Sequence, residues 1–354
     1  MLIYIALASL VFWGGFTKQA RHIYKGALIA LFILTAFRQP DWGGHDSSIY
    51  MNFFARVPVL KELQGFQSDY NIGYIFLNSF SKTIVNNYIF FQALLAAITM
   101  VLLYCVIEKA KLRDSEKCFF VFSYFCYRFM WNTWVTYRQN IANLVFGLFV
   151  MMFWQKRKAK ENIAMVGGVV ATSLFHSSAW VNLLSIPCDK FMEKWSSRKR
   201  AIVISAVSVF LWLFGGKVFS FILNFAISRI DLRYGMYAAA STGTSNVINY
   251  VFRLAVFLWL CLIYDHSDYE KKDVALSTLS IMVLLGSISS ELMLRIYEYY
   301  AIGLYLALAT CFRGFKGKNQ AIAAVIFFVV MMIIFVRGTL SFEGGVFADY
   351  QSCF

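Results

Sequence analysis

Long apolar runs recur along almost the whole chain, from Met1 to about Val336, and short polar or basic segments separate them. A helix that crosses the ~30 Å hydrocarbon core of a bilayer needs about 20 mainly apolar residues, and a helix inside a bundle can be shorter. The apolar runs 162–175 and 178–189 are short for helices that cross the whole bilayer. The alternative is a pair of broken helices that meet at His176. We predict twelve transmembrane helices, at roughly residues 1–16, 26–37, 86–107, 118–134, 139–154, 162–175, 178–189, 201–222, 248–264, 273–290, 293–312 and 320–336.

This pattern predicts an all-α, polytopic membrane protein with one transmembrane domain over residues 1–354 and outer loops at 38–85 and 223–249. The apolar segment 71–84 is short and is better explained as a re-entrant or interfacial helix. Composition agrees, because 60% of the residues are hydrophobic and only 15% are charged, whereas about a quarter are charged in a soluble protein. The first run has no basic segment before it, so we expect a signal anchor and not a cleaved signal.

The distribution of lysine indicates the orientation of the chain, since basic loops resist translocation across a membrane. If the N-terminus is outside, the inner loops hold 21 of the 33 basic residues, and 15 of these 21 are lysines. We therefore expect both termini outside. The inner loops are 17–25, 108–117, 155–161, 190–200, 265–272 and 313–319.

The other twelve basic residues are expected in or near the outer half of the bilayer, and nine of them are arginines. A cation there is costly unless it is paired or faces a wet cavity, and the planar guanidinium group binds phosphate through two hydrogen bonds. This arginine-rich set therefore suggests phosphate recognition. Nucleic acid is not expected as a partner, because the basic residues are spread over short loops and not gathered on one soluble face.

The first outer loop begins at Arg38, where an apolar run ends, and continues through Gly43-Gly44, His45 and Asp46. A long loop with many ionisable groups is often functional, so we expect a substrate-facing role for Arg38. The alternative is a solvated loop whose glycine turn is capped by Asp46.

A second polar group surrounds the turn between two predicted helices, where Arg128 and Arg138 bracket Trp134. An aromatic belt with interfacial anchors explains the tryptophan. It explains Arg138 poorly, because Asn140 and Asn143 continue the polar stripe into the next helix. A functional role for Arg138 is therefore expected.

Two histidines, His45 and His176, are expected on the outer side, and histidine is the side chain that ordinarily titrates near neutrality. Each is a candidate for proton transfer to or from a substrate. A neutral His176 that donates one hydrogen bond within the bundle is the alternative.

Further arginines lie in the last long outer loop and in the helices after it. Arg229 and Arg233 are one helical turn apart and would share a face, although an amphipathic helix on the outer surface fits equally well. Arg253 lies too deep in its run for ordinary interfacial anchoring. Arg295 either faces substrate or forms an internal ion pair with Glu291.

The chain lacks a Gly-rich phosphate loop, a zinc-protease motif, a nucleophile elbow and an outer Asp-x-Asp pair. We therefore expect no metal and no cofactor. The energy for any transfer would reside in the substrate itself, as in a lipid-linked pyrophosphate.

Over roughly residues 30–310 the chain resembles the EpsG/Wzy group of bacterial polysaccharide polymerases. The resemblance consists of an arginine that ends an early helix, a Gly-x-Asp-x-x-x-Tyr loop, Gly-Tyr, Arg-Gln and Phe-His pairs, and a Tyr-rich basic outer loop. Members of the group often carry an acidic residue where this chain has Asn71, and a small residue where it has His45. The matching residues are Arg38, Gly44 to Tyr50, Gly73-Tyr74, Arg138-Gln139, Phe175-His176, Arg233-Tyr234 and Tyr237.

The resemblance implies a glycosyltransferase of the GT-C type that joins undecaprenyl-pyrophosphate-linked repeats into an O-antigen, capsule or exopolysaccharide. It would act at the outer side of the bacterial inner membrane. Its partners would be the lipid-linked donor and acceptor and membrane lipid, with a chain-length regulator as a further candidate. His176 or Asp46 would be the base, with Arg138 also catalytic. The implied substrate-binding residues are Arg38, Arg128, Arg229, Arg233, Arg253, Arg295, Tyr50, Tyr74, Trp134 and Tyr234.

Two other functions use similar residues. A flippase for lipid-linked oligosaccharide also needs a basic, aromatic-lined cavity, but alternating access predicts polar residues in both halves of the bilayer. A membrane acyltransferase acting on surface glycans would also use a histidine and arginines, with an acyl donor supplied from the inner side. The concentration of arginine on one side favours the polymerase.

Overall fold

The computed structural model describes residues 1–354 except 43, 45, 155–158, 228–246, 289 and 354. The described residues form helices and connecting segments, and their only β-type pairing is an isolated bridge between Arg38 and Ser352. The prediction of an all-α chain is therefore confirmed. Contacts within the chain divide it into unit 1, which comprises Met1–Met152, Gly167–Ser177 and Phe315–Phe354, and unit 2, which comprises Phe153–Val166 and Ser178–Gly314.

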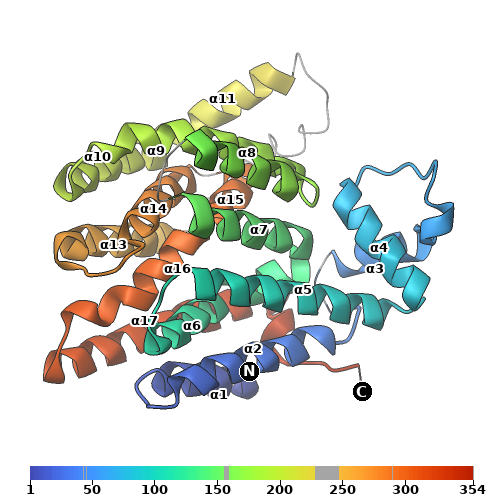
Figure 1. Cartoon of the computed structure of the whole chain (residues 1–354), viewed down its shortest axis with the longest axis horizontal. Helices are drawn as coiled ribbons and strands as arrows, with labels where there is room; N and C mark the ends of the chain where they lie inside the picture. Colours follow the sequence, from blue (N-terminus) through green and yellow to red (C-terminus); the bar gives the residue numbers. More distant parts are fainter. Residues whose placement is uncertain (43, 45, 155–158, 228–246, 289, 354) are drawn as a thin grey trace. The chain divides into compact units, whose positions relative to one another are not determined.

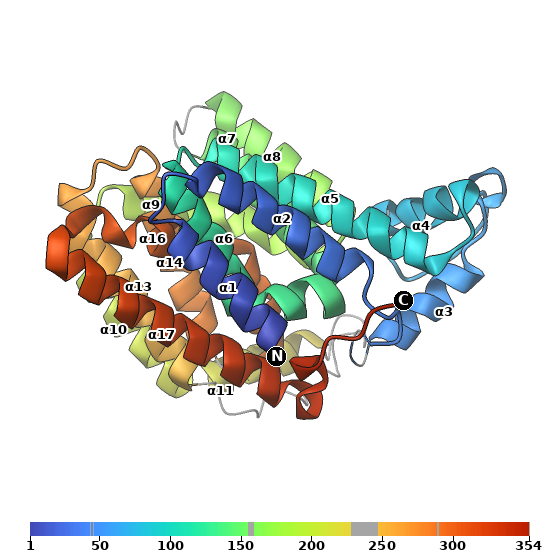
Figure 2. The ribbon, with the colours of Figure 1, turned by 90° about the horizontal axis from the view of Figure 1, so that it is seen from below.

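Unit 1 is built around α6, against which α1, α2 and α17 pack (Figure 1). Phe12 of α1 contacts Phe122 of α6 and Phe328 of α17, with ring centroids 4.8 and 5.2 Å away. Helices α3 and α4 lie beside the N-terminal end of α5 in both views (Figure 1 and Figure 2). The helices of this unit are α1 (Leu2–Gly14), α2 (Ala20–Ala36), α3 (Ser47–Arg56), α4 (Ile72–Ile84), α5 (Tyr88–Lys109), α6 (Asp114–Met130), α7 (Tyr137–Phe153) and α17 (Gly317–Ser341).

Unit 2 has α14 at its centre, in contact with α10, α13, α15 and α16. Helix α8 (Ala159–Ser173) begins in unit 2 and ends in unit 1. The other α-helices of unit 2 are α9 (Ser185–Glu193), α10 (Ser197–Phe210), α11 (Gly216–Ile227), α13 (Val247–Ile263), α14 (Lys272–Ser287), α15 (Glu291–Tyr297) and α16 (Ala301–Thr310).

Each of the twelve predicted segments coincides with a helical part of the structure. Among the described residues, four helical stretches are long and apolar enough to cross a membrane, and two shorter apolar helices accompany them. The chain is thus a membrane protein, while the count of twelve crossings and the GT-C-type bundle stay predictions. The four stretches are Tyr88–Lys109, Ser197–Phe221, Leu292–Arg313 and Gly317–Gly344, and the shorter helices are Leu2–Gly14 and Val247–Ile263.

Helix α4 is amphipathic in the way expected for an interfacial helix. Every fourth residue from Ile72 to Ile84 is a large, exposed apolar side chain, so these residues form one stripe along the helix. Tyr74 and Asn78 are buried on the other face. A helix with one apolar exposed stripe and one packed face can lie in the plane of a membrane surface.

The connection between α6 and α7 departs from α-helical geometry. Arg128 has φ −155° and ψ 22°, which places a kink in α6. A π-helical turn, Trp131–Val135, follows, and the amide of Thr136 donates to the carbonyl of Trp131 (3.0 Å). π-Helical turns frequently occur at functional sites, and α7 starts immediately afterwards with Tyr137 and Arg138.

Candidate functional site

Arg138 lies in a cage of tyrosine rings. Its guanidinium carbon is 4.4 Å from the ring centroid of Tyr70, 5.2 Å from that of Tyr74 and 5.6 Å from that of Tyr50. A guanidinium within about 6 Å of an aromatic ring is attracted by the negative face of the ring. Three consecutive segments, α3, the loop before α4, and α4 itself, therefore surround a cation that lies more than 60 residues after Tyr74 along the chain; we call this arrangement the Arg138 cage.

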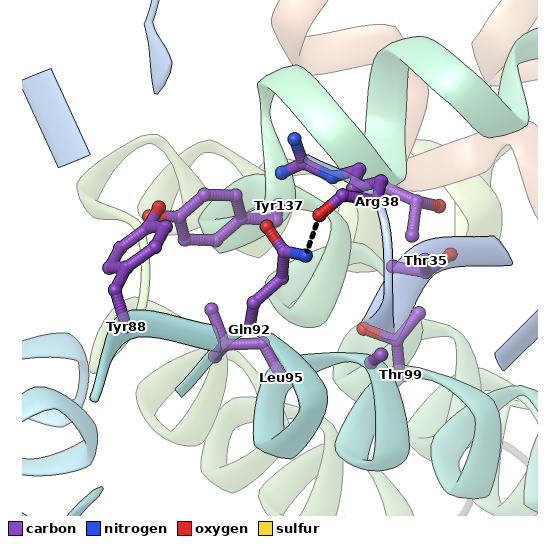
Figure 3. A pocket seen from close by; sticks show the side chains of 9 residues that line it. Thr35, Arg38, Tyr88, Gln92, Leu95, Thr99 and Tyr137 are labelled. Atoms are coloured by element: carbon purple, nitrogen blue, oxygen red, sulfur yellow. Dashed lines mark hydrogen bonds between the residues drawn. The ribbon is translucent and has the colours of Figure 1, made fainter. Parts of the chain in front are cut away.

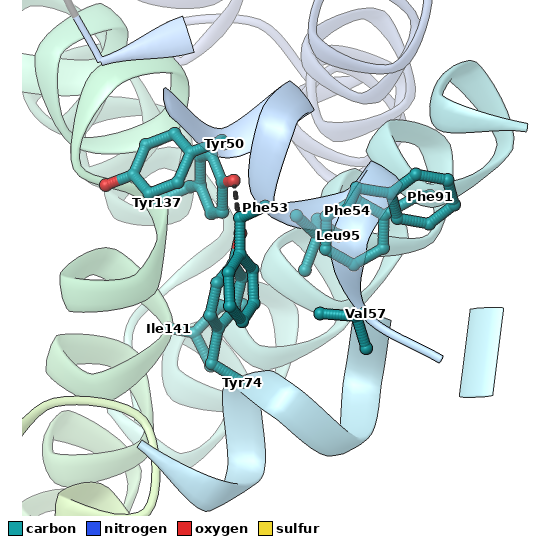
Figure 4. Packing of buried hydrophobic residues seen from close by; sticks show 9 residues of the cluster. All are labelled: Tyr50, Phe53, Phe54, Val57, Tyr74, Phe91, Leu95, Tyr137 and Ile141. Atoms are coloured by element: carbon teal, nitrogen blue, oxygen red, sulfur yellow. Dashed lines mark hydrogen bonds between the residues drawn. The ribbon is translucent and has the colours of Figure 1, made fainter. Parts of the chain in front are cut away.

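Two tyrosines of the cage, Tyr50 and Tyr74, belong to a buried aromatic cluster that fixes the positions of their rings (Figure 4). The hydroxyl groups of Tyr74 and Tyr137 are hydrogen-bonded at 2.7 Å. The rings of Tyr50 and Tyr137 are 4.3 Å apart, and Phe53 stacks on Tyr74 at 5.4 Å. Such close-packed rings leave few alternative rotamers, so the tyrosines that surround Arg138 are held in place before any ligand arrives.

The cage does not neutralise the charge of Arg138. Burial raises the pKa of Tyr50, while the nearby Arg138 guanidinium acts in the opposite direction. A tyrosine whose pKa is raised stays a neutral phenol near pH 7. Among the described residues no carboxylate forms an ion pair with Arg138, and the Nε atom of Arg138 is buried without a hydrogen-bond partner. The arrangement therefore provides a cation and a free donor for an anion.

Arg38 is buried more deeply than Arg138, which is half-buried. The side chain of Arg38 is 2% exposed, and Nη2 donates to the carbonyl of Trp134 at 3.3 Å. Nε and Nη1 have no partner. Beside Arg38 lies a cavity of about 10 Å3 (Figure 3), which Gln92, Tyr88 and Tyr137 also line.

The segment that carries His176 is attached to the start of α4. The amide of Gly73 donates to the carbonyl of Leu174 at 2.8 Å, and Nδ2 of Asn71 donates to the carbonyl of Ser173 at 3.0 Å. Phe175 packs against the cluster that contains Tyr74. The Gly-Tyr and Phe-His pairs of the sequence are thus neighbours in unit 1, and half-buried His176 directly follows this attachment.

The side chain of Asn71 explains why an amide suits this position. The amide of Asn71 carries an N–H donor for the Ser173 carbonyl, whereas an ionised carboxylate in its place would put two acceptors together. The residue is the N-cap of α4, but its side chain makes no capping hydrogen bond. Its contact with residue 173 therefore takes the place of the usual capping role.

Asp46 lies one residue before α3, the helix that contributes Tyr50 to the cage. Its half-buried carboxylate makes no capping hydrogen bond with the helix. Gly44 has φ +75°, a conformation that favours glycine. Asp46 therefore does not cap α3, as the alternative explanation of this loop required, and Gly43 and His45 lie outside the described residues.

Trp134 and Arg128 contact aromatic rings other than those of the Arg138 cage. Trp134 is fully buried, and the rings of Trp42 and Phe347 lie 5.2 Å from it. No open face of this indole is left for a sugar. Arg128 lies at the kink of α6, half-buried and 6.0 Å above the partly exposed ring of Trp131.

Arg253 and Arg295 belong to unit 2, and the structure describes them separately from the Arg138 cage. Arg253 is 2% exposed, donates from Nη2 to the carbonyl of Gly286 at 2.8 Å and lies 4.6 Å from the Tyr297 ring centroid. Arg295 is half-buried on α15. The predicted residues Arg229, Arg233 and Tyr234 lie outside the described residues.

Sequence reasoning missed three residues of this region: Tyr70, Tyr137 and Gln92. Gln92 could have been noticed, because an amide within an apolar run needs partners inside the protein. Tyr137 precedes Arg138 directly. Tyr70 gives no comparable signal, since a tyrosine in an outer loop is common in membrane proteins and only the fold brings it onto Arg138.

Comparison with known proteins gives one match. The family model described as "EpsG family" matches residues 26–352, nearly the whole chain. Searches of curated proteins and of solved structures each returned no match.

Proposed function

We propose a function for this chain from the premise that it belongs to the EpsG family, a Wzy-like family of polysaccharide polymerases. The proposal is that it joins undecaprenyl-pyrophosphate-linked oligosaccharide repeats into a surface polysaccharide. The reaction would occur on the outer side of the bacterial inner membrane. A glycosyltransferase-like activity follows from the family in general, and the lipid-linked donor is the specific part of our proposal.

One observation carries the proposal, namely that neutral rings surround the guanidinium of Arg138 and that no carboxylate among the described residues pairs with it. A buried cation is costly unless an opposite charge compensates it. A diphosphate supplies such a charge and several acceptor oxygens, and it matches the fork of N–H groups that arginine presents. Arg138 would therefore bind the diphosphate of the donor and stabilise the negative charge that develops as this group leaves.

The reaction balances without a further reagent. A hydroxyl oxygen of the acceptor sugar forms a bond to the anomeric carbon of the donor chain. The bond between that carbon and the diphosphate oxygen breaks, and its electron pair stays on undecaprenyl pyrophosphate. The proton of the acceptor hydroxyl passes to a general base.

His176 and Asp46 are the two candidates for that base. His176 follows the segment attached to α4, and Asp46 precedes the helix that carries Tyr50. Both therefore adjoin elements of the Arg138 cage. Tyr50 and Tyr74 are proposed to act on the donor through the cage that holds Arg138, because their side chains, like that of Trp134, are buried.

The remaining arginines are candidates for further contacts with substrate. Arg128 lies outside the cage on α6, and Arg253 and Arg295 belong to unit 2. Together with Arg229, Arg233 and Tyr234 they are proposed to bind the lipid carriers or the glycans.

The test replaces Arg138 with Lys, which keeps the charge and removes the planar fork. We expect the variant to insert normally and to lose long-chain polysaccharide, because a point charge cannot form the two parallel hydrogen bonds. Chain length is measured on gels of polysaccharide from cells that carry the variant, and insertion by immunoblotting of membranes. One unextended repeat should accumulate on the outer side.

Arg56→Lys is the matched control, since Arg56 is exposed at the end of α3 and its Nε donates to the carbonyl of Asn52 in the same helix. It should give polysaccharide of normal length. Normal chain length in Arg138→Lys would contradict the proposal. Accumulation of repeats on the cytoplasmic face would instead indicate a flippase.

A further inference from the structure

We infer that Arg38 is a positioning residue, which holds the turn that presents Arg138, and that Gln92 orients Arg38 for this purpose. The inference rests on the proposed function, because it assigns Arg38 a task within the same site. It differs from the sequence-based expectation that Arg38 itself touches the substrate.

The space beside Arg38 is too small for a diphosphate. The cavity of about 10 Å3 is close to the smallest volume that holds one water molecule. A diphosphate contains two phosphate groups and is several times larger. Since Arg38 is 2% exposed, binding a diphosphate there would require the surrounding aromatic cluster to open.

The contacts of Arg38 lead to the turn before Arg138. Nη2 of Arg38 donates to the carbonyl of Trp134 at 3.3 Å, and Nε1 of Trp134 donates to Oγ1 of Thr35 at 3.3 Å. The end of α2 thus holds both the backbone and the side chain of a residue in the π-helical turn. Arg138 follows four positions later, so the placement of this turn determines where its guanidinium lies.

Gln92 of α5 holds the backbone of Arg38 in turn. Its Nε2 donates to the carbonyl of Ala36 at 3.0 Å and to the carbonyl of Arg38 at 2.8 Å (Figure 3). The last carbonyls of a helix lack partners within the helix, and this single amide serves one of them, that of Ala36, together with the carbonyl of Arg38 just beyond the helix. Oε1 of Gln92 and Nε and Nη1 of Arg38 are buried without hydrogen-bond partners, and both residues line the same small cavity.

The first experiment is a double-mutant cycle with inorganic diphosphate as the probe and the full chain in detergent. Arg138→Lys is expected to weaken the Kd at least about tenfold, because the bidentate contact is lost. Arg38→Gln should weaken it by a smaller factor. In the double variant the two losses should not multiply, because a misplaced turn matters only through Arg138.

The second experiment measures hydrogen exchange of the amides of residues 131–137. Arg38→Gln and Gln92→Leu should both raise exchange there and leave α17 unchanged, whereas Arg138→Lys should leave residues 131–137 protected. Asn86→Leu is the control for Gln92→Leu, because Asn86 is an exposed amide two residues before α5. Its exchange pattern should match that of the unmodified protein.

The outcomes separate the inference from the proposed function. If the two losses in diphosphate affinity multiply in the double variant, and hydrogen exchange at residues 131–137 is unchanged in Arg38→Gln, Arg38 binds diphosphate independently. This result would overturn the positioning role. If Arg138→Lys binds diphosphate normally, the proposed function fails, and the exchange measurement still decides whether Arg38 holds the turn.

Discussion

At the scale of single residues, the site depends on how one positive charge is kept inside the protein. Arg138 is half-buried and faces three neutral rings. Cation–π attraction supplies about 0.5–2 kcal/mol, depending on how far the pair is desolvated. This stabilises the position of the guanidinium but is small beside the cost of burying an uncompensated charge, which is several kcal/mol. An anionic ligand should therefore bind tightly here.

Substitution of Tyr70 tests the contribution of the nearest ring. Tyr70→Phe keeps the ring, so the kcat/KM for polymerisation should stay within about twofold of the unmodified protein. Tyr70→Leu removes the π face and should lower kcat/KM by about two- to thirtyfold, which corresponds to the energy of the lost interaction. The rate is measured on purified lipid-linked repeats by chain-length analysis.

Phe76→Leu is the control for Tyr70→Leu, because Phe76 is 49% exposed on α4 and contacts another exposed ring, that of Phe80, at 5.9 Å. It should leave kcat/KM unchanged. Equal activity of Tyr70→Phe and Tyr70→Leu would refute a role for the π face in holding Arg138.

At the scale of elements, the start of α4 joins two motifs that are about a hundred residues apart in the chain. Gly73 lies so close to the segment that precedes His176 that a Cβ atom at this position would be 2.8 Å from the Leu174 carbonyl oxygen. Real Cβ atoms essentially never come so near. The Gly-Tyr pair of the sequence is thus explained by a close approach of two backbones, with Tyr74 then directed into the cage.

Gly73→Ala should consequently destabilise the protein by about 1–3 kcal/mol, the usual cost of overpacking. The carbonyl of Leu174 would have to move, which also lengthens its hydrogen bond with residue 73. Thermal unfolding in detergent measures the effect as a lower Tm. Gly26→Ala is the control, since nothing lies within 4 Å of its Cβ position in α2 and alanine favours a helix. A Tm for Gly73→Ala equal to that of Gly26→Ala would contradict the explanation.

At the scale of the whole molecule, charge and hydropathy decide how the chain lies in a membrane. Lysines collect in the predicted inner loops, where they carry some of the described ion pairs, such as Lys117 with Glu108 at 2.8 Å. The exposed apolar side chains of the long helix α17 suit contact with lipid. The orientation itself remains a prediction from the distribution of basic residues.

Reporter fusions test this orientation and the number of crossings together. Alkaline phosphatase fused after residue 354 should be active, because the C-terminus is expected outside. The same enzyme fused after residue 316 should be inactive, because the loop 313–319 is expected inside. Activity in the fusion at 316 and none at 354 would show that the orientation is the reverse of the predicted one. Equal activity in both would show that the helix predicted at 320–336 does not cross the membrane.

The sequence alone predicted the long apolar helices, because the backbone of an apolar run inside a membrane must satisfy its own hydrogen bonds. It did not predict α3, which lies within the expected outer loop 38–85. It also singled out Arg138 as a candidate, since an arginine beside amides and after an aromatic turn is poorly explained as an interfacial anchor. The Gly-Tyr and Phe-His pairs were visible as motifs, but their spacing along the chain does not show that they touch.

Only the tertiary structure decided which of these residues act together. It brings Tyr50, Tyr70 and Tyr74 onto Arg138 and buries Trp134. It also surrounds Arg38 with a space that fits no more than a water molecule. The physical reason is that hydropathy specifies where a helix lies relative to lipid, whereas side-chain partners depend on packing between helices that are far apart in the sequence.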